Sequence, residues 1–229
     1  MNQAVYTQDG ESIISAYFAR VYMHMTGALV ISGLVAWWAA HSIAFVELIA
    51  TNSSVIWILI IAELGLVFWL AARAQKMSAT TAIAAFMIYA ALNGLTLSTI
   101  FLVYTAASIT KAFLSTAGLF GIMSLYGYTT KRNLASMGGF LFMSLIGIII
   151  ASVVNFWFKS PAIEWVVTYA GVFIFIGLTA YDTQKLKRIG AQAAQAGVWE
   201  QLAILGALTL YLDFINLFLF LLRIFGRRD

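Results

Sequence analysis

Residues 202–222 have the sequence LAILGALTLYLDFINLFLFLL, and this stretch decides the fold class. Its 21 residues contain one acidic residue, Asp213, and no basic residue. The hydrocarbon core of a bilayer is about 30 Å thick, and an α-helix of roughly 20 apolar residues crosses it. The apolar residues are continuous and do not alternate with polar ones, as they would in a strand of a transmembrane β-barrel. We therefore predict a transmembrane helix here.

Six further apolar stretches precede this one. Hydrophobic residues make up 62% of the chain and charged residues 10%, against about 25% charged residues in ordinary soluble proteins. So few charged side chains cannot cover the surface of a soluble globular protein, and that class is excluded. We predict an all-α membrane protein with seven transmembrane helices, at approximately 21–40, 55–72, 82–103, 112–128, 138–157, 164–183 and 202–222.

Seven spans leave no room for a second, soluble domain in a chain of 229 residues. We therefore predict a single polytopic membrane domain over 1–229. In the amino-terminal segment, 1–20, the residues Ile14, Tyr17 and Phe18 follow helical spacing. We expect this segment to be an interfacial helix that runs into the first span.

Several chemistries lack the residues that they require. Cysteine is absent, which excludes disulfides, thiolate metal sites and thiol catalysis. The two histidines, His24 and His41, belong to different predicted elements, so a histidine metal site is not expected. The net charge of +4 comes from basic residues in short loops, which favours contact with the lipid bilayer over nucleic acid. We expect no tightly bound cofactor.

Basic residues divide unevenly between the two sides of the predicted bundle. Cytoplasmic loops of membrane proteins carry the excess of Lys and Arg. With the amino terminus in the cytoplasm, eight of the thirteen basic residues lie on that side: Arg20, Arg73, Lys76, Lys131, Arg132, Lys185, Lys187 and Arg188. We therefore predict a cytoplasmic amino terminus. An odd number of spans then places the carboxyl terminus outside, unless the last segment is re-entrant.

The last span carries a stripe of small and polar residues. Gly206, Thr209, Asp213 and Asn216 follow helical spacing, and lipid offers no hydrogen-bond partner to such a stripe. We therefore predict that this helix is central in the bundle and that Thr209 and Asn216 line a pore. A single interhelical hydrogen bond that holds the bundle together is the alternative role for a buried aspartate.

A second aspartate, Asp182, ends the preceding span. Ionisable residues within spans are costly and usually face a partner or a water-filled cavity. Two carboxylates about 4 Å apart repel by roughly 4 kcal/mol at an effective dielectric of about 20. If Asp182 and Asp213 meet in the bundle, they would share one proton and titrate as a unit. Arg73, at the end of the second span, would favour the ionised pair as a latch. Ionised carboxylates also attract calcium.

Glu63 lies within the otherwise apolar second span. Its carboxyl group either lines a cation path or is protonated and hydrogen-bonded. Asn93 in the third span either lines the same cavity or serves packing.

Four motifs in these spans resemble the Bax inhibitor-1 family, also called the transmembrane Bax inhibitor motif family. They lie in the third to seventh spans, at 94–98 (GLTLS), 123–132 (MSLYGYTTKR), 177–184 (GLTAYDTQ) and 210–218 (LYLDFINLF). The bacterial inner-membrane branch is the most similar.

The resemblance implies a bundle in which the other six helices wrap the last one. It also implies a pH-sensitive leak of calcium, the transported ion, across the inner (plasma) membrane. The family's di-aspartyl pH sensor corresponds to Asp182 and Asp213, which would bind calcium transiently, and its arginine latch corresponds to Arg73.

Two other functions stay open. Some bacterial relatives act without transport, as regulators that bind a membrane protease or a stress complex. Two membrane aspartates also resemble an intramembrane aspartyl protease, but such enzymes carry Gly-x-Gly before the second aspartate, and here Leu210, Tyr211 and Leu212 precede Asp213. We therefore expect a protein that is not an enzyme.

Overall fold

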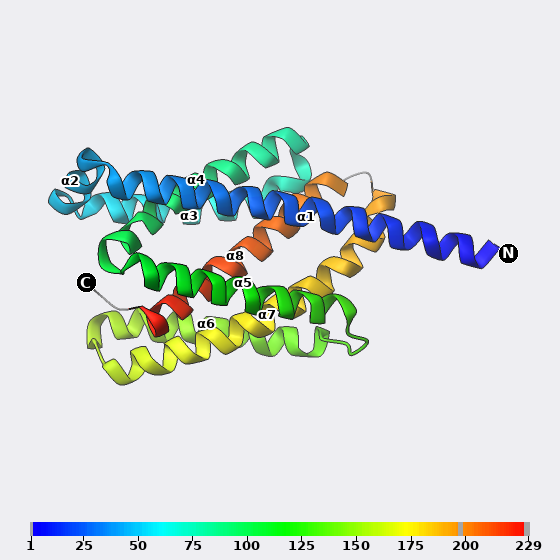
Figure 1. Cartoon of the computed structure of the whole chain (residues 1–229). Coiled ribbons are helices and arrows are strands. Elements are labelled where there is room, and N and C mark those ends of the chain that lie inside the picture. The colour runs from blue at the N-terminus through cyan, green and yellow to red at the C-terminus, as the bar shows by residue number, and fades with distance from the viewer. Residues whose placement is uncertain (1, 197–198, 227–229) are drawn as a thin grey trace. The chain divides into compact units, whose positions relative to one another are not determined.

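The computed structural model describes residues 2–196 and 199–226, with side chains at 12–192 and 199–226. Within these residues the protein has helices and no strands. The elements, labelled in Figure 1, are α1 (Asn2–His41), α2 (Ile43–Thr51), α3 (Ser54–Arg73), the 3₁₀ turn η1 (Ala74–Lys76), α4 (Ala79–Val103), α5 (Ala106–Thr129), α6 (Ala135–Phe158), α7 (Pro161–Ala196) and α8 (Trp199–Phe225).

Seven helical segments of the described chain are long and apolar enough to cross a bilayer. They are Ser12–His41, Ser54–Lys76, Ala79–Val103, Ala106–Thr129, Ala135–Phe158, Pro161–Gln192 and Trp199–Phe225. Each contains one of the seven predicted ranges. The prediction of an all-α membrane protein with seven spans is therefore confirmed.

Local sequence signals set several helix boundaries. Ser78 and Thr105 precede α4 and α5, and their hydroxyl oxygens accept hydrogen bonds from the amides of Thr81 and Ser108. Such caps satisfy amide groups that have no partner within the helix. At the end of α6, Lys159 adopts a left-handed conformation with φ of 49°, which turns the chain sharply toward Pro161 and α7.

Two helices differ from the sequence prediction. The span predicted to end at 183 continues as helix to Ala196. Leu186 and Gly190 are both buried there and lie four residues apart, on the same face of the helix. The short helix α2, between the first two spans, was not predicted. α1 is continuous from Asn2 to His41, and the interfacial position of 1–20 stays a prediction.

The chain forms two compact units. Unit 1 contains Met1–Tyr104 and Arg188–Tyr211, and unit 2 contains Thr105–Lys187 and Leu212–Asp229. That 1–229 behaves as one membrane domain stays a prediction.

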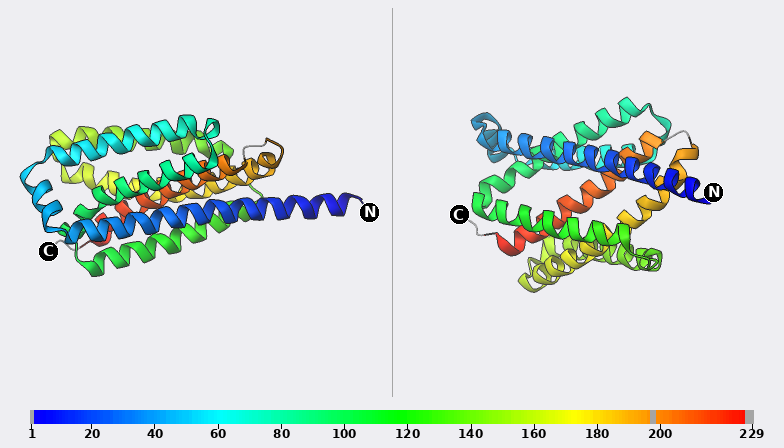
Figure 2. Two further views of the ribbon diagram at one scale, coloured as in Figure 1. Left: turned by 90° about the horizontal axis from the view of Figure 1, so that it is seen from above. Right: turned by 45° about the vertical axis from the view of Figure 1, so that its right-hand side comes forward.

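In unit 1, α4 packs between two neighbours. α1 and α3 each lie along α4, and α2 joins α1 to α3 (Figures 1 and 2). A Cβ atom at Gly94 would lie 2.7 Å from the backbone oxygen of Ser32. Glycine at this position therefore allows the close approach of α4 to α1, which brings polar groups of the two helices within hydrogen-bond distance.

In unit 2, α7 packs closely on α5 and α8. A Cβ atom at Gly127 would overlap the backbone of Ala180, and one at Gly171 would lie 2.5 Å from the ring of Phe220. A hydrophobic core of α6, α7 and α8 surrounds these contacts, with Leu141, Ile148, Val167, Val172, Ile174, Phe175, Leu178, Leu217 and Leu221 as its buried members. This packing fixes the position of Asp182 on α7.

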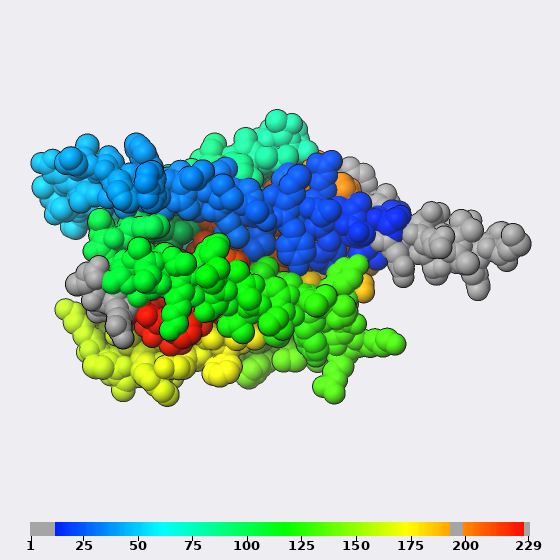
Figure 3. Space-filling model, viewed as in Figure 1, coloured from blue at the N-terminus to red at the C-terminus, as the bar shows by residue number. Residues whose placement is uncertain are grey.

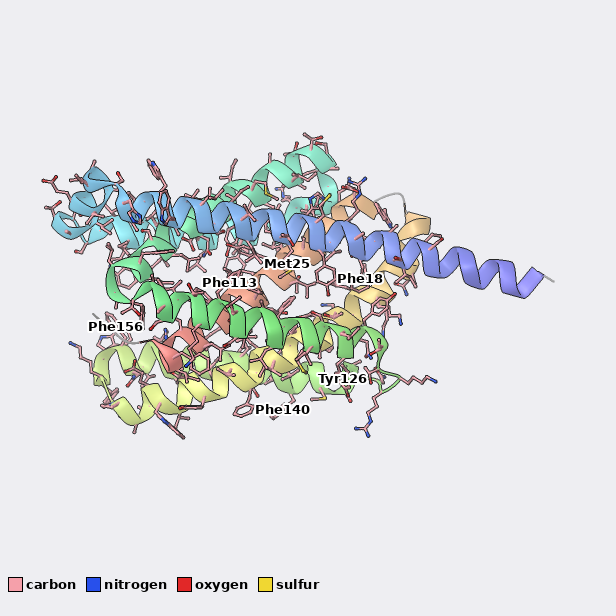
Figure 4. All side chains as sticks on the ribbon, viewed as in Figure 1. Phe18, Met25, Phe113, Tyr126, Phe140 and Phe156 are labelled. Carbon is pink, nitrogen blue, oxygen red and sulfur yellow. The ribbon has the colours of Figure 1, made fainter. Side chains whose placement is uncertain are left out.

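Burial differs strongly among the spans. In the apolar window of α8, 67% of residues are buried, against 44% in α7 and 6% in α3. Of the seven windows, that of α8 has the largest share of buried residues, and the central position of this helix among the other six stays a prediction. Phe140 and Phe156 of α6, labelled in Figure 4, are 70% and 62% exposed. Large exposed apolar side chains of this kind contact lipid in a membrane protein.

We expect Gly127→Ala to lower the free energy of unfolding by about 1–3 kcal/mol, because a methyl group there collides with backbone that cannot rotate away. Gly121→Ala is the matched control, since Gly121 lies on the same helix with open space around it. Thermal unfolding in detergent measures both. Equal effects of the two substitutions would contradict the close contact of α5 with α7.

Candidate functional site

Asp182 on α7 and Asp213 on α8 meet inside unit 2. Their carboxyl groups lie close enough to interact with each other. The two residues are only 8% and 5% exposed. The structure therefore brings together the two carboxyl groups that the sequence singled out, and their role in gating stays a prediction.

The contact between these carboxyl groups has a direct chemical consequence. A carboxylate has only acceptor oxygens, so two carboxyl groups form a hydrogen bond only when one of them carries a proton. Asp213 Oδ2 is buried and has no hydrogen-bond partner in the described residues. A proton shared by the two carboxyl groups would supply such a donor, and the shared proton stays a prediction.

Polar contacts just after Asp182 anchor α7. Gln184 Nε2 donates to the backbone oxygen of Arg132, and Gln184 Oε1 accepts from the amide of Leu134, both at 2.8 Å. Lys187 Nζ donates to the backbone oxygen of Tyr128 at 2.9 Å. These contacts tie α7 to the end of α5 and to the connection between α5 and α6.

Lys185 is the charged residue of α7 that acts on Asp182. It lies one turn beyond Asp182 on α7, is exposed, and acts on Asp182 electrostatically. Arg73, the predicted latch, ends α3 in unit 1 with an exposed side chain. Its action on the pair in unit 2 stays a prediction.

Unit 1 contains a buried carboxyl group of its own, that of Glu63, which is 9% exposed. Asn93 Nδ2 donates to Glu63 Oε2 at 3.1 Å, and the hydroxyl of Thr96 donates to Glu63 Oε1. The Tyr211 hydroxyl donates to Asn93 Oδ1 at 2.9 Å and lies 2.7 Å from Ser32 Oγ. We call these five residues the Glu63 network; they connect α3, α4, α8 and α1.

The Glu63 network supplies hydrogen-bond donors to a carboxyl group on α3, the span with the smallest share of buried residues. Two donors on α4 reach both oxygens of Glu63, so its side chain turns toward protein although most of α3 is exposed. Ser32 and Tyr211 were not predicted as site residues. Their signal was faint: each is a single polar group in a long apolar span.

The other predicted pore-lining residues bond to their own helix. Thr209 Oγ1 donates to the backbone oxygen of Leu205 at 3.0 Å, and Asn216 Nδ2 donates to that of Leu212 at 2.8 Å. Thr209 belongs to unit 1 and Asn216 to unit 2. The structure therefore does not join them to either carboxyl group, and their pore-lining role stays a prediction.

Calcium binding depends on oxygen ligands. Calcium takes about 6–8 oxygens, and no group of three or more His, Cys, Asp or Glu side chains gathers in the described residues. Asp182 and Asp213 could contribute two carboxylates once their shared proton has left. Such a partial ligand set suits a transported ion better than a resident one, and calcium binding here stays a prediction.

Comparison with known proteins agrees with the resemblance in the motifs. The family described as "Inhibitor of apoptosis-promoting Bax1" matches residues 14–229. The inner membrane protein YbhL of Escherichia coli (strain K12) is 58% identical over 217 residues, which cover 94% of this chain and 93% of that protein. An uncharacterized protein of Borreliella burgdorferi is 41% identical and covers 97% of both chains. An uncharacterized membrane protein of Streptococcus pyogenes is 36% identical over this whole chain. The chain therefore belongs to the Bax inhibitor-1 family.

Proposed function

We propose that this protein is a pH-sensitive calcium leak channel of the inner membrane, gated by protonation of the Asp182–Asp213 pair. The observation that carries the proposal is the contact between two buried carboxyl groups on neighbouring spans. Such a pair holds α7 and α8 together only while it retains a proton.

Loss of this proton changes the force between the two helices. Two negative charges then occupy a site with little water, where the interaction of charges is stronger than in bulk solvent. Lys185 is exposed and offsets only part of this repulsion. The ionised pair also becomes a ligand for a cation. One titration thus alters both helix packing and cation affinity.

The Glu63 network is the proposed cation-contacting part of unit 1. Glu63 and the amide oxygen of Asn93 are oxygen ligands of the kind that calcium prefers. The alternative is structural: a protonated Glu63 held by Asn93 and Thr96 would only tie α3 to α4. The substitution Glu63→Gln, which removes the charge and keeps the shape of the side chain, distinguishes the cation ligand from the structural role.

Regulation without transport is the second candidate. The family description favours it, because it names an inhibitor and no transported ion. In that case the protein would act by binding a membrane protease or a stress complex, and the purified protein would carry no calcium flux.

We expect the double variant Asp182→Asn/Asp213→Asn to lose the pH dependence of calcium flux in proteoliposomes. Asparagine imitates the protonated carboxyl group, so the variant should show at every pH the flux that the wild type shows at low pH. Glu47→Gln is the control, since Glu47 is an exposed acid on α2. A pH dependence that survives the double substitution would remove the pair from the mechanism.

For Glu63→Gln, we expect the calcium flux to fall, because the substitution removes a negatively charged oxygen ligand of the kind that calcium prefers. The pH dependence should remain, since the Asp182–Asp213 pair is intact. An unchanged flux with a lowered unfolding temperature would instead assign Glu63 to packing.

The absence of cysteine makes the orientation directly measurable. With a cytoplasmic amino terminus, Asn133→Cys, between α5 and α6, should react only with a thiol reagent on the cytoplasmic side. Asn52→Cys, between α2 and α3, should react only from the outside. The reverse labelling pattern would invert the predicted topology.

A further inference from the structure

A pocket opens in unit 2 where α7 begins and α8 ends. Its volume is about 260 Å³, and Pro161, Glu164, Trp165, Thr168, Tyr169 and Arg223 are among the residues that line it. Figure 3 shows the end of α8, in red, next to the yellow atoms of α7. Pockets for drug-sized ligands are usually about 300–1,000 Å³, so this one suits a smaller polar group.

Two residues of opposite charge, Glu164 and Arg223, line this pocket and form no ion pair with each other. Glu164 and Arg223 are both exposed, and the ion pairs of the described residues involve neither of them. The Arg223 guanidinium lies over the ring of Phe220, 5.5 Å from its centroid. A ligand that fits this arrangement carries a negative group for Arg223 and a positive group for Glu164.

The position of the pocket along the spans limits the source of that ligand. Pro161 is the first residue of α7, and Arg223 lies in the last turn of α8, so the pocket is at the end of two membrane spans. Trp165 and Tyr169 are one helical turn apart, with ring centroids 4.5 Å from each other. Exposed Trp and Tyr side chains are typical of the level of the lipid headgroups.

We propose that this pocket binds the headgroup of one zwitterionic phospholipid that bears a phosphate and a primary ammonium group, as in phosphatidylethanolamine. Arg223 donates hydrogen bonds to the phosphate, and Glu164 accepts them from the ammonium group. Trp165 and Tyr169 pack beside the glycerol region. An anionic headgroup would leave Glu164 facing a negative charge, and a choline headgroup has no N–H donor for it.

Lipid titration of the full-length protein in detergent, followed by native mass spectrometry, tests this site. We expect phosphatidylethanolamine to bind roughly tenfold more tightly than phosphatidylglycerol or phosphatidylcholine, the ratio set by one charge-assisted hydrogen bond. Arg223→Gln should weaken phosphatidylethanolamine binding by about the same factor. Glu164→Gln should remove the preference for phosphatidylethanolamine over the other two lipids.

Lys159→Gln is the matched control, because Lys159 carries a positive charge on the connection from α6 to α7 and does not line the pocket. It should leave phosphatidylethanolamine binding unchanged. Equal affinity of the wild type for the three lipids, or tighter binding of phosphatidylglycerol, would overturn the proposal. So would an equal loss in Arg223→Gln and Lys159→Gln, since that result reports net charge and not a built site.

Discussion

The contact between the buried carboxyl groups of Asp182 and Asp213 is the constraint on which the proposed mechanism depends. Both carboxyl groups are buried between α7 and α8, and Asp213 Oδ2 has no hydrogen-bond partner in the described residues. The helices reach this contact because α7 packs against backbone at Gly127 and against the ring of Phe220 at Gly171. Close packing of this kind resists gradual deformation. A change of charge at the pair therefore favours a second packing over a small adjustment.

The protein places its buried acids in two separate polar clusters. The Glu63 network belongs to unit 1 and the aspartate pair to unit 2. α8 is one continuous helix that carries Tyr211 of the first cluster and Asp213 of the second. Residues two apart on an α-helix point to opposite faces, about 200° from each other. α8 thus carries one member of the cluster proposed to sense protons and one member of the network proposed to contact cations.

The seven spans were predictable because hydropathy reflects the cost of placing polar backbone and side chains in lipid. The extension of α7 to Ala196 was not predictable from hydropathy, because the apolar run ends at Lys185 and Lys187 while the helix continues beyond them. The rarity of acids within spans singled out Asp182 and Asp213, and their pairing was implied by the family resemblance. The partners of Glu63 were harder to find, because a lone serine or tyrosine can equally bond to its own helix. The hydrogen bonds of Gln184 to the backbone of Arg132 and Leu134 could not be predicted, because they join residues about 50 positions apart in the sequence.

Infrared difference spectroscopy of the purified protein across pH reports most directly on the shared proton. The structure predicts a carbonyl band of a protonated carboxyl group that disappears at alkaline pH and is missing from Asp182→Asn/Asp213→Asn. The same band should persist in Glu63→Gln. A band that survives the double substitution and vanishes in Glu63→Gln would place the proton in unit 1, and the aspartate pair could then not be the sensor.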